Sequence, residues 1–167
     1  TGTCTTSWFF TFNSTVTENR CPGQVITSKA AGEDFEGGRV YWYEASGIFA
    51  QNVIYVIFND GGWSVYGDTW DNSQPFNDPS IIPPQGRYQP VAGIGKLWRT
   101  QPGLRDKLGW AFEPERAFTG RRQEPILPSD STVYDLYIDH GVRNVVLRLR
   151  RPLVGNGQFT WIVAGTY

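Results

Sequence analysis

Short apolar runs separated by turn-forming residues recur along most of the chain. The run 53–58 is continuously apolar, and the turn sequence Asn-Asp-Gly-Gly and a second short apolar run follow it. Because these turn residues tolerate positive φ, this order predicts a tight β-hairpin. The stretches 133–138, 145–150 and 158–163 place apolar residues at every second position, which is typical of strands with one buried face.

Two segments depart from this strand pattern. Within 94–108, Ile94, Leu97 and Trp98 share one helical face, and the helical spacing continues to a glycine stop, so one or two short helices are expected. Within 68–90, several prolines exclude a helix or an interior strand. We expect a long loop there, held against the body by its own aromatic and aliphatic residues.

Length and composition turn this pattern into a fold class. The chain has 167 residues, of which 40% are hydrophobic, and this fits one domain with a real core. Aromatic residues make up 15%, while 19 glycines and 11 prolines provide turns. We therefore predict a mostly β fold, a compact antiparallel β domain (small barrel, sandwich or propeller-like) with short helices only near 94–108.

The two cysteines, Cys4 and Cys21, bracket a predicted strand at 7–12 and a turn at 13–15. A hairpin here would bring the sulfurs together, and a disulfide would contribute about 3 kcal/mol in the chain-entropy model. A zinc site needs four ligands, whereas the sequence has a single histidine, His140, and no Cys-x-x-Cys motif. We expect a structural disulfide, with free buried thiols as the alternative.

Compartment and partners follow from cysteine use and charge. A disulfide, together with the lack of methionine in a chain that starts at Thr1, indicates a mature exported protein: extracellular, on the cell surface or periplasmic. The net charge of −1 argues against nucleic acid as a partner, and no segment approaches the ~20 apolar residues of a membrane span. The arginines of 143–151 alternate with apolar residues, so we interpret them as the solvent-facing side of a strand.

A further signature consists of Gly93-Ile-Gly-Lys-Leu-Trp98 and Gly103-Leu-Arg-Asp-Lys-Leu-Gly-Trp-Ala111, followed by Glu115. In these residues the chain resembles a recurrent module of secreted and surface-anchored bacterial proteins of unassigned function. It is more distantly similar to the LGFP repeat, a cell-wall-associated motif. The resemblance covers about residues 30–120, implies an extracytoplasmic, aromatic-rich β scaffold and provides no catalytic residues. The single domain 1–167 would then comprise a disulfide-stapled hairpin at 1–29, a family-like core at 30–120 and C-terminal strands at 121–167.

Catalytic groups are scarce in the sequence. One histidine, and the lack of a Gly-x-Ser-x-Gly or phosphate-loop motif, argue against nucleophilic and nucleotide chemistry. Four aspartates in or beside the long loop, Asp60, Asp68, Asp71 and Asp78, are the acids that a glycosidase or a calcium site would use. Turn formation through their own side chains is the other interpretation. We expect no enzyme activity and no cofactor, with calcium and a small glycan hydrolase as the alternatives.

Aromatic residues provide the binding candidates. Trp42, Trp98 and Trp161 lie on apolar faces, and we assign them to the core. Aromatic rings beside acids suit either a sugar or a protein partner. The candidate binding residues are Trp63, Asp68, Trp70, Asp71 and Tyr88.

These observations predict a non-catalytic extracytoplasmic interaction or assembly module, a structural or accessory component of a cell-surface or secreted structure. Its partners would be proteins or further copies of the same chain. A carbohydrate-binding module for cell-wall or matrix glycan is the alternative.

Overall fold

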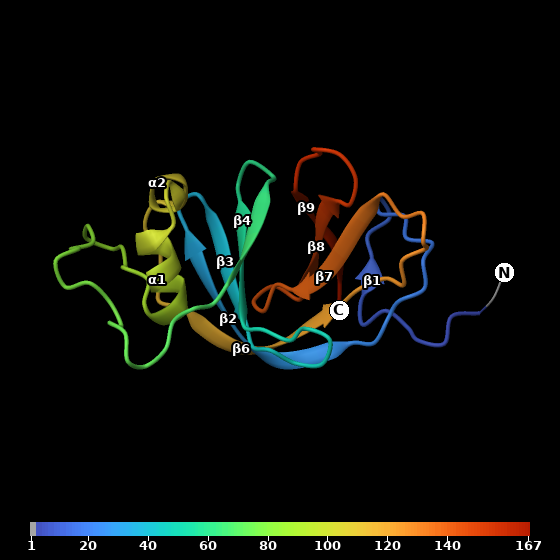
Figure 1. Ribbon diagram of the computed structural model, residues 1–167, viewed down its shortest axis with the longest axis horizontal. Helices are drawn as coiled ribbons and strands as arrows, with labels where there is room; N and C mark the ends of the chain where they lie inside the picture. The colour runs from blue at the N-terminus through green and yellow to red at the C-terminus, as the bar shows by residue number, and fades with distance from the viewer. Residues whose placement is uncertain (1–2) are drawn as a thin grey trace.

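In the computed structural model, which describes residues 3–167, the chain forms one antiparallel sheet of nine strands with two short helices (Figure 1). The elements are β1 (Thr11–Phe12), β2 (Ile26–Phe35), β3 (Gly38–Tyr43), β4 (Val53–Phe58), β5 (Trp63–Gly67), α1 (Ala92–Thr100), α2 (Leu104–Leu108), β6 (Arg116–Gln123), β7 (Val133–Asp139), β8 (Val145–Pro152) and β9 (Thr160–Thr166). The strand order is β1-β9-β8-β7-β6-β2-β3-β4-β5. The predicted mostly β class, the β4–β5 hairpin and the two short helices are confirmed.

The sheet consists of two halves, β2–β5 and β6–β9, joined where β6 pairs with β2. The halves curl toward each other, so that the β4–β5 turn contacts β9. There, the amide of Trp161 donates to the carbonyl of Gly61 at 2.9 Å. Two indoles also cross between the halves. Trp63 Nε1 donates to the Arg150 carbonyl at 2.9 Å, and Trp161 Nε1 donates to the Phe58 carbonyl at 2.8 Å. The curl is therefore fastened at this end by backbone and side-chain bonds.

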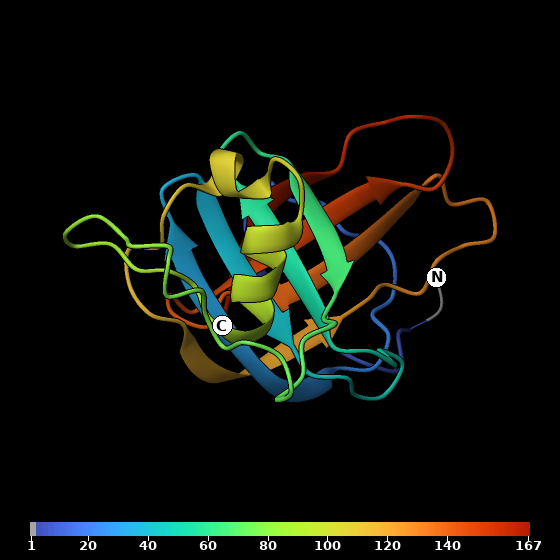
Figure 2. The ribbon, with the colours of Figure 1, turned by 60° about the vertical axis from the view of Figure 1, so that its left-hand side comes forward.

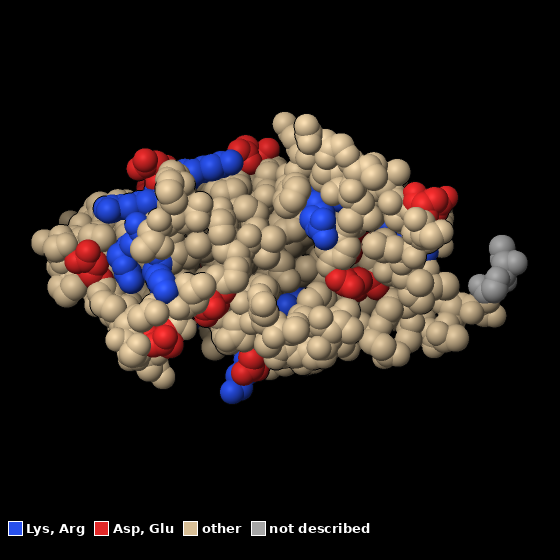
Figure 3. Space-filling model, in the orientation of Figure 1, with Lys and Arg blue, Asp and Glu red and all other residues tan. Residues whose placement is uncertain are grey.

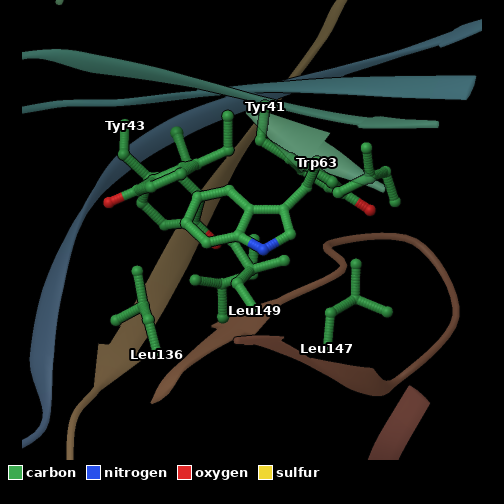
Figure 4. Packing of buried hydrophobic residues seen from close by; sticks show 10 residues of the cluster. Tyr41, Tyr43, Trp63, Leu136, Leu147 and Leu149 are labelled. Carbon is green, nitrogen blue, oxygen red and sulfur yellow. The ribbon is translucent and has the colours of Figure 1, made fainter. Parts of the chain in front are cut away.

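The main core lies between the two halves of the sheet (Figure 4). Trp63 of β5 sits in its centre, with Tyr41 and Tyr43 of β3 on one side, and leucines 136, 147 and 149 of β7 and β8 on the other. Period-2 alternation accounts for these inward positions.

A second core forms where α1 and α2 cover the outer face of β3 and β4 (Figure 2). Trp98, the largest fully buried side chain in this layer, is 1% exposed and donates from Nε1 to the Gly109 carbonyl at 2.8 Å. Neither helix of residues 3–167 is long and apolar enough to cross a membrane.

The N-terminal segment does not form the predicted hairpin. Between Cys4 and Cys21 only Thr11 and Phe12 are in a strand. They pair with β9 and not with a second strand of the N-terminal segment, as a hairpin would require. Phe10 is buried against Tyr137 and other residues of the outer face of β7–β9, and Trp8, Phe9 and Phe12 pack around it. An isolated two-stranded hairpin is marginal in water, whereas this face provides a large apolar surface. Thr1 and Gly2 lie outside the described residues.

The predicted disulfide is confirmed: Cys4 and Cys21 are bonded, with their Cα atoms 5.3 Å apart. We expect its reduction to loosen residues 3–22 before the sheet, because this segment loses a loop closure worth about 3 kcal/mol, whereas the two main cores of the sheet contain no residue of the segment. Limited proteolysis with and without reductant measures this. Titration of two free sulfhydryls in native protein would contradict it.

Arg148 and Arg150 of β8 are not on a solvent-facing side, so the interpretation of 143–151 from the sequence is wrong for these two, whereas Arg143, which precedes β8, is exposed. The carboxylate of Asp135 on β7 is fully buried and accepts hydrogen bonds from Arg150 Nε at 2.7 Å and Arg150 Nη2 at 2.8 Å. Arg20 of the N-terminal segment also donates to it, and Arg148 lies 3.9 Å away. Next to them, Tyr137 donates from its hydroxyl to Glu18 at 2.7 Å. The N-terminal segment therefore covers this face and is tied to it by charge.

Candidate functional site

A pocket of about 570 Å³ opens between the start of α1 and the outer face of β2, β3 and β6. It exists because α1 covers β3 and β4, while the small side chains of Ala31 on β2 and Ala117 on β6 leave the neighbouring sheet surface open. Its polar and aromatic walls come from Trp42, Asp68, Trp70, Glu115, Lys29 and Thr119. The volume lies within the ~300–1,000 Å³ typical of small-molecule sites.

Asp68 is fixed at the centre of the wall, just after β5. Its Oδ2 accepts from Trp42 Nε1 at 2.8 Å, and its Oδ1 accepts from the backbone amide of Trp70 at 3.0 Å. A Cβ at Gly93 would lie only 2.6 Å from Oδ1, so glycine is required for the carboxylate to approach α1. The carboxylate orients the Trp42 ring and the Trp70 backbone at once.

The neighbouring residue Ala92 also lines the pocket and has a φ of +48°, which is unusual for a residue other than glycine. Its amide donates to the carbonyl of Phe76 at 2.8 Å, which holds this backbone in place. Strain of this kind costs on the order of 1–3 kcal/mol and is concentrated at functional sites.

Trp70 forms the outer lip of the pocket. Its Nε1 donates to the Pro75 carbonyl at 3.2 Å, and its ring packs edge-on against Phe76 with centroids 6.3 Å apart. Lys96 of α1 donates to the Thr69 carbonyl at 2.9 Å. These bonds hold the start of the predicted long loop against the body and keep the half-buried indole at the opening.

Glu115 extends the acidic side of the pocket, and the buried Glu33 lies next to it on β2. Burial and the charge of Asp68 raise the pKa of Glu115. Glu115 precedes Arg116, which pairs with Gly32, so it lies opposite Glu33 on the next strand. Glu33 is 1% exposed, and burial, with the charges of Glu115 and Glu113 against that of Arg39, raises its pKa to about 8. Glu33 is therefore mostly protonated at neutral pH.

The structure brings Asp68 and Trp70 together and separates the other candidates from them. Trp63 is a core residue, 6% exposed, and does not line this pocket. Tyr88 is 45% exposed but lies outside the pocket, where its backbone pairs with Ala111. Trp42, assigned to the core from its apolar surroundings, packs against the second core but is only half-buried, and it also lines the pocket.

The remaining aspartates accept hydrogen bonds within the turns in which they lie. Asp71 Oδ1 accepts from the amide of Ser73 at 2.8 Å, Asp78 accepts from Ser80 at 2.9 Å, and Asp60 accepts from Gly62 at 2.9 Å. Hydrogen bonds from the Ser73 hydroxyl and amide lower the pKa of Asp71. Within residues 3–167, no three acidic, histidine or cysteine side chains converge as a metal site would require.

Sequence reasoning identified Asp68 and Trp70 from their place in the loop, but it missed that Trp42 and Glu115 line the same pocket and that the buried Glu33 lies opposite Glu115. These positions follow from the pairing of β2 with β3 and β6, which no local pattern reveals. Comparison with protein-family models, curated proteins and solved structures finds no match for the chain, so the resemblance of residues 30–120 to secreted modules stays a prediction.

Proposed function

We propose that this chain is a non-catalytic carbohydrate-binding module of an extracytoplasmic structure, and that its ligand occupies the pocket beside α1. The observation that carries the proposal is the grouping of two indoles, Trp42 and Trp70, with two carboxylates, Asp68 and Glu115, around one cavity.

Sugars need this combination of groups. The C–H face of a pyranose packs against an aromatic ring, while its hydroxyls donate to carboxylates and accept from ammonium groups. Trp42 and Trp70 provide the rings, Asp68 and Glu115 the acceptors, and Lys29 the donor. The mixed, nearly balanced charge of the surface shown in Figure 3 also suits a neutral ligand better than a polyion.

Each oxygen of Asp68 accepts one protein hydrogen bond, which fixes the carboxylate and leaves a lone pair on each oxygen for a sugar hydroxyl. Assembly through protein contacts is the alternative, with the β5 edge as its surface, because within the described sheet β5 pairs with β4 alone. The Cys4–Cys21 disulfide supports an oxidising, extracytoplasmic compartment for either function.

The experiment is a glycan array of cell-wall and matrix oligosaccharides, followed by calorimetric titration of the best ligand. We expect Trp70→Ala to weaken binding at least about tenfold, because the ring closes the pocket and aromatic anchors dominate binding energies. Tyr88→Ala is the matched control, since it removes an exposed aromatic side chain outside the pocket, and it should bind like the native protein. Equal loss in both variants, or no glycan bound by the native chain, would contradict the proposal.

A further inference from the structure

The pocket beside α1 carries more negative than positive charge. Asp68 and Glu115 line it, and among the described residues Lys29 is the one basic residue on its wall. Lys29 pairs with Thr119, which lies four positions along the chain from Glu115, so about 13 Å of strand separates the lysine backbone from that of the glutamate. Glu115 and Lys29 therefore mark an acidic and a basic end of the same pocket.

Neither carboxylate of the acidic end has a protein cation as its partner. The ion pairs found among residues 3–167 all involve other acids. Asp68 accepts its two hydrogen bonds from uncharged groups, the indole N–H of Trp42 and the amide of Trp70. Burial, and then the charge of Asp68, raise the pKa of Glu115, so the two carboxylates act on each other. A cation placed between them would relieve this repulsion.

The shape of the pocket and its aromatic walls indicate which kind of cation fits. Ala31 and Ala117 pair across β2 and β6 and form a low floor, which leaves room for a ring. A cation within about 6 Å of an indole face is stabilised by about 0.5–2 kcal/mol, and Trp42 and Trp70 both line this cavity. A bare metal ion needs several converging ligands, and in the described part of the chain no three such groups meet. An ammonium group needs only acceptors for its three N–H bonds.

Building on the carbohydrate-binding function proposed above, we propose that the sugar bound in this pocket is an amino sugar whose protonated amine lies between Asp68 and Glu115. The ammonium donates to a lone pair that each carboxylate keeps, and Lys29 donates to an oxygen of the ligand at the other end. Two acids and one lysine leave a charge of −1 on the pocket wall, so one amine balances it and a polycation is not required.

The test is calorimetric titration at pH 6.5, where a sugar amine, like an α-amino group, is mostly protonated. The ligands are the trisaccharide of N-acetylglucosamine and its three mono-deacetylated forms, each with one free amine on a different sugar unit. We expect at least one amine-bearing form to bind at least about tenfold more tightly than the fully acetylated trisaccharide, as one charge-assisted hydrogen bond provides.

Equal affinity for all four trisaccharides would overturn the assignment of an amino sugar and leave carbohydrate binding in place. Failure of all four to bind would overturn it as well, and the glycan array described above then shows separately whether the carbohydrate-binding function survives.

Glu115→Gln is the main variant, because Glu115 is exposed and glutamine keeps an oxygen that accepts from a sugar hydroxyl. We expect it to weaken binding of the amine-bearing form about tenfold more than binding of the acetylated trisaccharide. Asp106→Asn is the control, since it removes a negative charge from α2, outside the pocket, and should keep the native preference. The same loss of preference in both variants would mean a general attraction of cations to the protein and would overturn the proposal.

Discussion

Replacement of Asp135 by Asn is expected to lower the free energy of unfolding by about 3–5 kcal/mol, the cost of breaking a buried ion pair. Burial opposes the charge of Asp135, but hydrogen bonds from Arg150 and Arg20 more than offset it and lower its pKa. An amide cannot compensate Arg20, Arg148 and Arg150, which would remain charged in a largely covered site. Urea denaturation at neutral pH measures the loss.

The matched control is Asp130→Asn, because Asp130 is exposed in the loop between β6 and β7. It should change the unfolding free energy by less than about 0.5 kcal/mol. Limited proteolysis of Asp135→Asn should also cut within residues 3–22 first, since Arg20 ties that segment to β7. If the two variants were equally stable, the N-terminal segment would not be held by charge.

Replacement of Glu33 by Gln is expected to raise the unfolding free energy by about 3–4 kcal/mol at pH 7–8. The folded pKa of Glu33 is about 8, above its ordinary value of 4.5. The contribution of this group to stability is therefore fully present below pH 4.5 and is lost as the pH rises through 8, because the unfolded chain releases the proton and the folded chain must keep it. Glutamine fills the same space and needs no proton.

Urea denaturation at pH 4 and pH 8 checks both parts of this expectation. The gain should be large at pH 8 and close to zero at pH 4. Glu44→Gln is the control, because Glu44 lies just after β3 and is not among the acids that act on Glu33, which are Glu113 and Glu115. It should show neither effect. A gain that is the same at both pH values, or a loss at pH 8, would mean that Glu33 is ionised in the folded protein.

The elements that the sequence predicts well are those with a clear apolar period. The β4–β5 hairpin, β7 and β8 follow directly from their alternation or from a continuous apolar run bounded by turn residues. By contrast, β2 and β6 were not identified, although they join the two halves of the sheet. Their sequences, ITSKAAGEDF and RAFTGRRQ, contain Ala, Gly and charged residues, which have low strand propensity. Pairing with neighbours on both sides overrides that propensity.

The residues of the candidate site also divide into those that a local pattern indicates and those that it does not. Local composition indicated Asp68 and Trp70, because acids and aromatics in a long loop are typical of binding sites. Trp42 was assigned to the core because most of β3 is apolar, and nothing local shows that this residue also borders a pocket beside α1. The N-terminal hairpin failed for a related reason: Trp8 and Phe10 pack against Tyr137, more than a hundred residues away in the sequence.

The most direct test of the proposed glycan pocket is the indole N–H region of an NMR spectrum, which resolves the seven tryptophans during titration with an oligosaccharide. The indole N–H of Trp42 donates a hydrogen bond to Asp68 inside the pocket, and that of Trp70 donates to Pro75 at its lip. The indole N–H groups of Trp63 and Trp98 donate hydrogen bonds within the two cores. We predict saturable shifts of the Trp42 and Trp70 signals, with Trp63 and Trp98 unmoved. Shifts confined to other tryptophans, or none for any cell-wall or matrix glycan, would contradict this account.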